Sequence, residues 1–138
     1  MTLFDFFKND RFAVMAGVEL MEISEGYAKA RMLVTKDHLN GGGVCQGGAL
    51  FTLADLAFAA AVNSHLVLTF STSSNITFFQ SVAQGYVYAE AREIVNHPRL
   101  PYAEVKITDE GGRLIAVFTS SGYRKKDVPI ELDKYKRG

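Results

Sequence analysis

The sequence has few of the residues that build disulfide frameworks or metal sites. Its 138 residues include one cysteine, Cys45, and three histidines spread far apart along the chain. A single cysteine excludes a disulfide framework and a zinc site made of cysteines. Scattered histidines do not predict a metal site either. We therefore expect a fold held together by its apolar core, with no metal and no redox cofactor.

An excess of charge of either sign is also absent. Lys and Arg number 15, as do Asp and Glu, so the formal net charge is zero. A neutral chain has no overall field to attract nucleic acid or an anionic membrane. The longest apolar stretch, residues 49–62, contains Asp55 and is shorter than the roughly 18 residues of a membrane span. The chain also starts without a basic leader, unlike a signal peptide. These absences favour a cytoplasmic protein without a membrane or nucleic acid partner.

The composition that is present suits one folded domain. Hydrophobic residues make up 48% and charged residues 22%, which excludes disordered, collagen-like and coiled-coil chains. We expect a single domain over residues 1–138, with a short surface helix at residues 3–15 and a charged tail at residues 124–138. The tail has six bases and three acids. It is either a solvated terminus or a contact for an anionic ligand.

The order of apolar and turn residues predicts an α+β fold. Residues 18–34 alternate in part around Gly26, which indicates a hairpin. Residues 49–64 are rich in Ala and Leu and apolar on all sides, which is typical of a buried helix. Four later stretches alternate like strands: residues 69–79, 85–96, 102–108 and 114–123. One antiparallel sheet wrapped around the helix is the simplest arrangement that buries both.

Asp55 is the most informative position in the sequence. It is the only charged residue (Asp, Glu, Lys or Arg) between Asp37 and Glu90, and it lies in the middle of the predicted apolar helix. An ionised carboxylate in such surroundings is costly by several kcal/mol unless a partner or water offsets the loss of hydration. Asp55 either meets water or a loop on one helix face, or serves as a base or nucleophile in a substrate cleft.

The start of the same helix provides a second candidate element. The first-turn amides after Gln46 lack partners within the helix, and Gly47 and Gly48 let a ligand carbonyl approach them. These glycines either form an oxyanion site or only permit a tight turn. Gly47 and Asp55 are eight residues apart, which is about 12 Å along a helix. If both serve one reaction, they come from two chains of a symmetric dimer.

Residues 40–64, NGGGVCQGGALFTLADLAFAAAVNS, resemble the signature of the hotdog-fold acyl-CoA thioesterases. The closest branch is the PaaI-type family of phenylacetic acid degradation. The resemblance extends over about residues 17–123. It implies a hotdog fold, in which a long central helix is wrapped by a five- or six-stranded antiparallel sheet. It also implies a homodimer that pairs again into a tetramer.

The resemblance also implies roles for individual residues. Asp55 would be the catalytic carboxylate, and the partner subunit's Gly47 amide would polarise the thioester carbonyl. Asn40 would orient the nucleophile or water, and Ser71 would assist the water. Gln46 stands where the family usually has His. Glutamine forms hydrogen bonds but carries no proton near neutral pH, so it can position substrate without acting as an acid.

Several further residues are candidates for binding the substrate. Gly48 belongs to the helix start, and the aromatic residues Phe51 and Phe58 either fill the core or line an acyl pocket. Phe78 and Phe79 present the same alternatives, and for all four aromatic residues the core is the favoured interpretation. Arg99 and Arg124, with Lys125 and Lys126, either contact coenzyme A phosphates or are solvated.

The function implied by the resemblance is hydrolysis of acyl-CoA thioesters to a free acid and coenzyme A, with aryl or medium- to long-chain acyl groups. Coenzyme A enters only as part of the substrate. Two alternatives stand beside it. An enoyl-CoA hydratase of the same fold would need an acid–base pair, and the lack of His near residue 46 speaks against it. A non-catalytic acyl-CoA-binding protein would not need Asp55.

Overall fold

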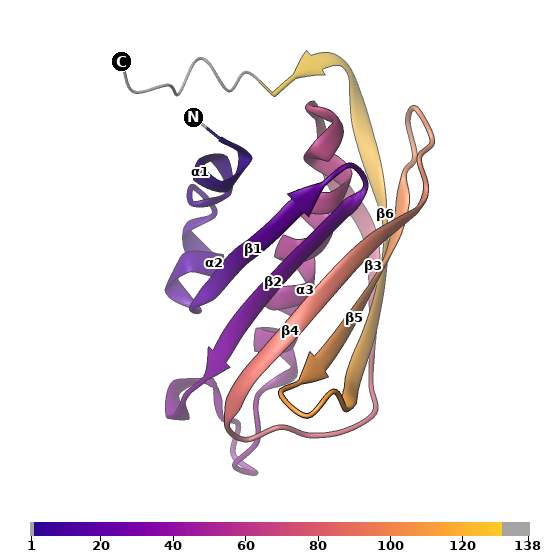
Figure 1. Cartoon of the computed structure of the whole chain (residues 1–138). Coiled ribbons are helices and arrows are strands. Elements are labelled where there is room, and N and C mark those ends of the chain that lie inside the picture. The colour runs from indigo at the N-terminus through magenta and orange to yellow at the C-terminus, as the bar shows by residue number, and fades with distance from the viewer. Residues whose placement is uncertain (1, 131–138) are drawn as a thin grey trace.

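A single long helix, α3 (Gly47–Val62), lies at the centre of the fold, inside the curve of one sheet (Figure 1). The computed structural model describes residues 2–130. Nine residues of α3 are buried, so the prediction of a buried central helix is confirmed. A short 3₁₀ turn, η2 (Asn63–His65), follows directly. Together, Gly47–His65 have the length and mean hydropathy (1.3) of a membrane span, which corrects our expectation, but more than half of this segment is buried inside the domain.

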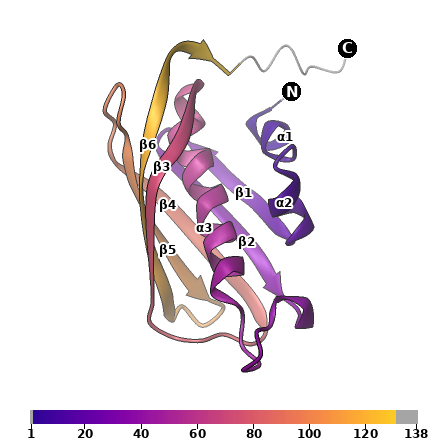
Figure 2. The same cartoon turned by 180° about the vertical axis from the view of Figure 1, so that it is seen from behind.

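Six antiparallel strands form the sheet that wraps α3 (Figures 1 and 2). Their spatial order is β1-β2-β4-β5-β6-β3, which leaves β1 and β3 at the two edges. The inward side chains of the central strands are mostly Ala, Val and Ile, and these small or β-branched residues allow the helix to pack closely. The bounds are β1 Val18–Ser24, β2 Tyr27–Val34, β3 Val67–Phe78, β4 Gly85–Val95, β5 Tyr102–Asp109 and β6 Leu114–Pro129.

The turn predicted at Gly26 is confirmed, and a second glycine turn joins β5 to β6. Gly26 has a φ of 69°, which suits glycine, and joins β1 to β2. Its amide donates a hydrogen bond to Ser64 Oγ (2.8 Å), so the turn is fixed against the end of the central helix. Between β5 and β6, Gly112 has a φ of 81° and its amide donates to the carbonyl of Asp109 (3.0 Å).

The predicted helix at residues 3–15 is wrong in one respect, because the structure divides it in two. Helix α1 (Leu3–Phe7) and helix α2 (Arg11–Met15) are separated at residues 8–10. The Asp10 side chain accepts a hydrogen bond from the Ala13 amide (3.1 Å) and so begins a second helix. Both helices pack beside β1 and α3 (Figure 2).

The C-terminal part of the chain also differs from expectation. Strand β6 continues to Pro129, so residues 124–129 of the predicted tail belong to the sheet. These residues are ordered because they pair with the first part of β3, where Arg124 lies opposite Thr69 and Pro129 opposite Val67. Residues 131–138 of the predicted tail lie outside the described residues.

Candidate active site

Asp55 lies in the middle of α3 with its side chain partly exposed, between the buried residues Ala54 and Leu56. Within residues 2–130 its carboxylate forms no hydrogen bond and no ion pair. Burial raises the pKa of the Asp55 carboxyl group above its usual value, and the negative charge of Asp10 raises it further. An unpartnered carboxylate with a raised pKa is a stronger base than an ordinary aspartate.

The first turn of α3 offers two free backbone donors. Gln46 caps the helix through its backbone, since its carbonyl accepts from the Ala49 amide (3.0 Å) and its side chain makes no capping bond. The amides of Gly47 and Gly48 donate to no acceptor within the described part of the chain. Amides at a helix start stabilise negative charge.

The backbone at residue 47 has little free space on the side that faces β3. A Cβ atom there would lie 2.8 Å from Cζ of Phe78, so the phenyl ring of β3 lies directly against the helix start. The Gln46 side chain turns back over the same turn, because a Cβ on Gly48 would lie 2.6 Å from Gln46 Oε1. Gln46 and Phe78 therefore border the free amides.

The loop before α3 is shaped by Asn40. Its Oδ1 accepts hydrogen bonds from the amides of Gly42 (2.9 Å) and Val44 (3.3 Å), which form a tight turn. The amide of Gln46 donates to the carbonyl of His38 (2.8 Å) and fixes the end of this loop. Asn40 Oδ1 is therefore used within the loop, while its amide group remains available for a ligand.

One chain does not bring all the predicted residues together. Gly47 and Asp55 share α3 and are separated by about 12 Å along its axis. Ser71 lies exposed on β3, the sheet edge, opposite Gly122 of β6. An amide donor and the carboxylate can therefore meet at one carbonyl carbon only if a second chain supplies one of them.

The prediction that Arg124 contacts coenzyme A phosphates is wrong for this structure. Arg124 is only 7% exposed, and its guanidinium group faces inward. Glu93 of β4, whose side chain is 5% exposed, forms an ion pair with it (3.5 Å). The other acceptors are Thr69 Oγ1, Asn96 Oδ1, and the carbonyls of Val62 and His97. Arg124 ties the C-terminal end of α3 to the sheet, and Arg99, which is partly exposed, is the arginine of this pair that solvent reaches.

The aromatic candidates divide between core and surface. Phe58 is 1% exposed and packs near Phe118, so it belongs to the core and not to a pocket wall. Phe51 is partly exposed and meets Phe118 edge to face at 5.2 Å. Phe78 and Phe79, for which core was the favoured interpretation, are 47% and 56% exposed at the end of the edge strand β3.

Two features of the site were missed from the sequence. Asp10, treated as a surface residue, lies close enough to Asp55 to affect its pKa. Beside it, α1, α2, β1 and α3 enclose a mostly apolar cavity of about 390 Å³. The apolar spacing of residues 3–15 was the available signal. The described residues contain no group of three His, Cys, Asp or Glu side chains placed to bind a metal ion.

Comparisons with known proteins agree with this architecture. The family model of the thioesterase superfamily matches residues 42–116, more than half of the chain. A protein of Archaeoglobus fulgidus named as a candidate esterase is 37% identical over 125 residues, which are 89% of this chain and 81% of that protein. The acyl-coenzyme A thioesterase PaaI of Escherichia coli is 29% identical over 119 residues, which are 86% and 85% of the two chains.

A solved structure supports the same assignment. The structure of the E. coli PaaI protein from the phenylacetic acid degradation operon superposes with a TM-score of 0.84. Its sequence is 30% identical, and the superposition covers 88% of each chain. The family match, the sequence relatives and this superposition cover the region that holds Asp55 and the start of α3. This chain therefore belongs to the thioesterase superfamily and is a thioester hydrolase with the hotdog fold.

Proposed function

We propose that this protein hydrolyses acyl-CoA thioesters to a carboxylic acid and coenzyme A, with Asp55 as the catalytic carboxylate. The observation that carries the proposal is the unpartnered, partly buried carboxylate on the central helix. A carboxylate in this setting destabilises the fold, so its presence favours a chemical role over a structural one. The name of the E. coli relative supports coenzyme A as the thiol.

The reaction needs a base and an oxyanion donor on opposite sides of the thioester. In one route, Asp55 takes a proton from water, and the water oxygen adds to the carbonyl carbon. The C=O electrons move onto oxygen and return to expel the coenzyme A thiolate, which takes up a proton. In the other route, Asp55 itself adds to the carbon, the C–S bond breaks and releases the coenzyme A thiolate, which takes up a proton, and water then cleaves the resulting anhydride to the two carboxylates. A single turnover in heavy-oxygen-labelled water distinguishes them, since only the second labels Asp55.

The oxyanion donor comes from a second copy of the chain. Strand β3 is a sheet edge with six consecutive exposed residues, Phe70–Asn75, and the exposed rings of Phe78 and Phe79 lie at its end. Pairing of two β3 edges covers this surface and the unpaired backbone groups. A two-fold axis there runs the two α3 helices antiparallel, and this places the partner subunit's Gly47 amide toward Asp55. Two such dimers then associate as a tetramer.

The remaining site residues assist this chemistry. The Asn40 amide group and the Ser71 hydroxyl hold the water or the substrate, and Gln46 donates a hydrogen bond to the thioester without supplying a proton. Gly48 leaves room above the helix start, and Phe51 borders the acyl group. Arg99 contacts the phosphates of coenzyme A. We place the enzyme in the cytoplasm, where acyl-CoA esters are made and used.

The test of the carboxylate is the Asp55→Asn variant, which keeps the size of the side chain. Thiol release from acyl-CoA should fall by at least about a thousandfold, because base and nucleophile are both lost. Asp37→Asn is the matched control, since Asp37 is exposed and its side chain forms no hydrogen bond or ion pair within residues 2–130. Equal activity of the Asp55 variant and the wild type contradicts the assignment.

The shared site has a sharper test in mixed dimers. Gly47→Pro removes the amide donor at the first helical position, which suits the proline backbone, and Gln46 already has the extended ψ of 139° that precedes proline. The added Cβ atom meets the tip of the Phe78 ring, which is 47% exposed and can turn away, and Gly47→Ala is the control because it adds the same Cβ atom and keeps the amide. Asp55→Asn and Gly47→Pro should each be inactive alone. A mixed dimer contains one intact site, so mixing the refolded variants should restore activity. No recovery in a dimer shown to be mixed contradicts a site built from two chains.

The same preparations separate the two alternative functions. Binding of acyl-CoA without thiol release by the wild type would favour a non-catalytic binding protein. Addition of water to a crotonyl-type thioester would favour the hydratase.

A further inference from the structure

His38 forms hydrogen bonds through both nitrogens of its ring, and the reaction proposed above uses neither of them. Nδ1 accepts from the backbone amide of Thr35 (2.9 Å), and Nε2 lies 2.6 Å from the carbonyl oxygen of Ala16. A backbone amide can only donate, so the Nδ1 atom that accepts from it carries no proton. The ring is therefore neutral, with its proton on Nε2 and donated to Ala16. This half-buried side chain is held in one tautomer by backbone groups from two parts of the chain.

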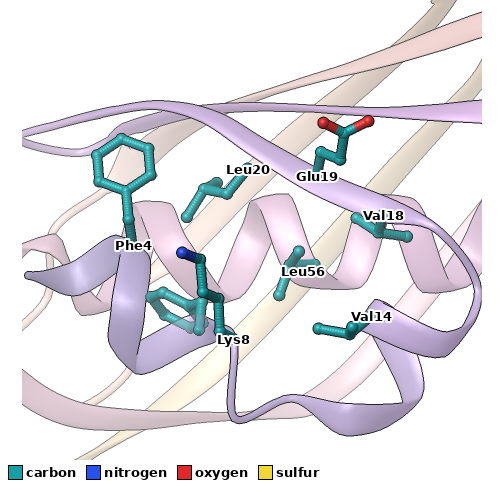
Figure 3. A pocket seen from close by; sticks show the side chains of 8 residues that line it. Phe4, Lys8, Val14, Val18, Glu19, Leu20 and Leu56 are labelled. Atoms are coloured by element: carbon teal, nitrogen blue, oxygen red, sulfur yellow. The ribbon is translucent and has the colours of Figure 1, made fainter.

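The Ala16 carbonyl, to which the ring donates, belongs to the N-terminal segment that packs against the central helix. Ala16 follows the last residue of α2 and precedes β1. Val14 and Val18, on either side of Ala16 in the chain, line a cavity together with Leu56 of α3 (Figure 3). The side chain of His38 is therefore attached to a segment that is itself packed against α3.

The backbone of His38 forms the base of the loop that leads into α3. Its carbonyl accepts from the amide of Gln46 (2.8 Å). Two residues further into the loop, the Asn40 amide donates to the carbonyl of Val44 (2.8 Å), so the two sides of the loop are paired. Gln46 is the residue at which α3 begins, and the first turn of that helix carries the two free amides. The position of His38 therefore sets the position of Asn40 and of these amides.

Within the described part of the chain, two hydrogen bonds tie this loop to segments that are distant in sequence. One is the bond from the His38 ring to Ala16, and the other joins the Cys45 amide to the carbonyl of Val82 (2.7 Å). Residues 40–43, at the tip of the loop, are exposed. Loss of the His38 ring should therefore let the loop shift while the apolar core of the domain stays folded.

We propose that His38 is a positioning residue for thioester hydrolysis: its neutral ring, through the bond to Ala16, holds Asn40 and the first-turn amides of α3 in place. The inference rests on the proposed function, because the amides matter as donors to the thioester oxygen. Such donors act most strongly when that oxygen becomes negative, so their displacement slows the chemical step more than it weakens substrate binding. A displacement of about 1 Å can cost about a hundredfold in rate.

The experiment measures thiol release from acetyl-, octanoyl- and phenylacetyl-CoA by three variants. His38→Ala keeps neither bond of the ring, His38→Asn can still accept from Thr35 through Oδ1, and His38→Gln is long enough to donate from Nε2 to Ala16. On the best of the three substrates, kcat of His38→Ala and His38→Asn should fall by about tenfold to a hundredfold, with KM changed by less than about threefold. His38→Gln should keep at least about a third of the wild-type kcat. Lys36→Ala is the matched control, since Lys36 lies in the same turn, is exposed and has a side chain without a hydrogen bond or ion pair within residues 2–130.

Two further measurements do not depend on activity. In ¹⁵N–¹H NMR spectra of the wild type at neutral pH, the ring of His38, assigned by its absence in His38→Gln, should have its proton on Nε2 alone. A proton on Nδ1 overturns the inference. Hydrogen exchange of the Gln46 amide should be at least about tenfold faster in His38→Asn than in the wild type, and His38→Gln should restore most of its protection.

The outcomes separate this inference from the proposed function. An unchanged kcat in His38→Ala and His38→Asn, an equal fall of kcat in all three variants, or a loss confined to KM overturns the positioning role even if hydrolysis is fast. If His38→Ala does not fold, the comparison of His38→Asn with His38→Gln carries the same test. If the wild type releases no thiol, the proposed function fails, and exchange of the Gln46 amide decides whether His38 anchors the loop: faster exchange in His38→Asn than in His38→Gln supports it, and equal exchange overturns it.

Discussion

Loss of the Arg124 guanidinium should unfold the protein at a much lower temperature, because it would leave a buried negative charge. The Glu93 side chain is 5% exposed, and its two carboxylate oxygens face Arg124 (3.5 Å) and His65 (2.8 Å). Removal of one partner of a buried ion pair costs about 3–5 kcal/mol. An unfolding entropy of about 2.1 cal/mol/K per residue gives about 0.29 kcal/mol/K for 138 residues. Arg124→Met should therefore lower Tm by about 10–17 °C.

The assay is thermal unfolding followed by circular dichroism at one fixed protein concentration, since self-association also affects Tm. Lys126→Met is the control, because it removes the same charge from an exposed position on the same strand. Its Tm should change by less than about 2 °C. The double variant Arg124→Met/Glu93→Gln should recover part of the loss, because no buried charge remains.

The same variants test the corrected role of Arg124. At a temperature where Arg124→Met is folded, its KM for acyl-CoA should equal that of the wild type, since an inward-facing side chain cannot reach the substrate phosphates. A Tm for Arg124→Met within about 3 °C of the wild-type value would refute the reasoning about the buried pair. A raised KM in the folded variant would restore the substrate-binding role.

Three further predictions concern Asp55 and the sheet. Asp10→Asn keeps a helix-capping side chain but removes a negative charge that raises the pKa of Asp55; the acidic limb of the pH–rate profile should move to lower pH, and an unmoved limb contradicts the coupling. The pKa of Asp55 is higher in the folded chain than its ordinary value of 3.8. The free energy of unfolding of the wild type therefore falls as the pH rises from 3.8 through the folded-state pKa. Asp55→Asn should have a higher Tm than the wild type at pH 7, with a smaller difference at pH 3. Gly122→Ala would place Cβ 3.2 Å from the carbonyl oxygen of Phe70 and should cost about 1–3 kcal/mol in urea unfolding, whereas Gly111→Ala makes only a 3.5 Å contact and should cost less.

The features that sequence predicted well are those decided by local pattern. Residues 49–62 are rich in Ala and Leu and apolar on all sides, so a buried helix at α3 was predictable. Gly26 likewise marked the hairpin between β1 and β2. Asp55 was noticeable because the cost of a carboxylate in an apolar helix is a property of neighbouring residues alone. Its connection to Asp10 depends on tertiary packing across 45 positions of sequence.

The features that the sequence predicted wrongly depend mostly on contacts between residues far apart in the chain. In the sequence, Arg124 belongs to a charged tail. In the structure it is buried with Glu93 as its ion-pair partner, and Glu93 lies 31 residues away in the chain. Phe78 alternates like a core residue, yet its strand β3 occupies the sheet edge, which no local pattern determines. The break between α1 and α2 was predictable from the sequence, since Asp is a favoured residue at the start of a helix and Asp10 caps α2.

The strand order places β1 and β3 on opposite margins of the sheet, with α3 between them. The α1–α2 segment therefore rests against one margin, and the margin suited to self-association is the other. Substitutions confined to the first seventeen residues therefore leave unchanged the residues of β3, the edge at which we propose that two copies pair. Because four strands separate the two margins, a sequence change at one margin makes no direct contact with the other.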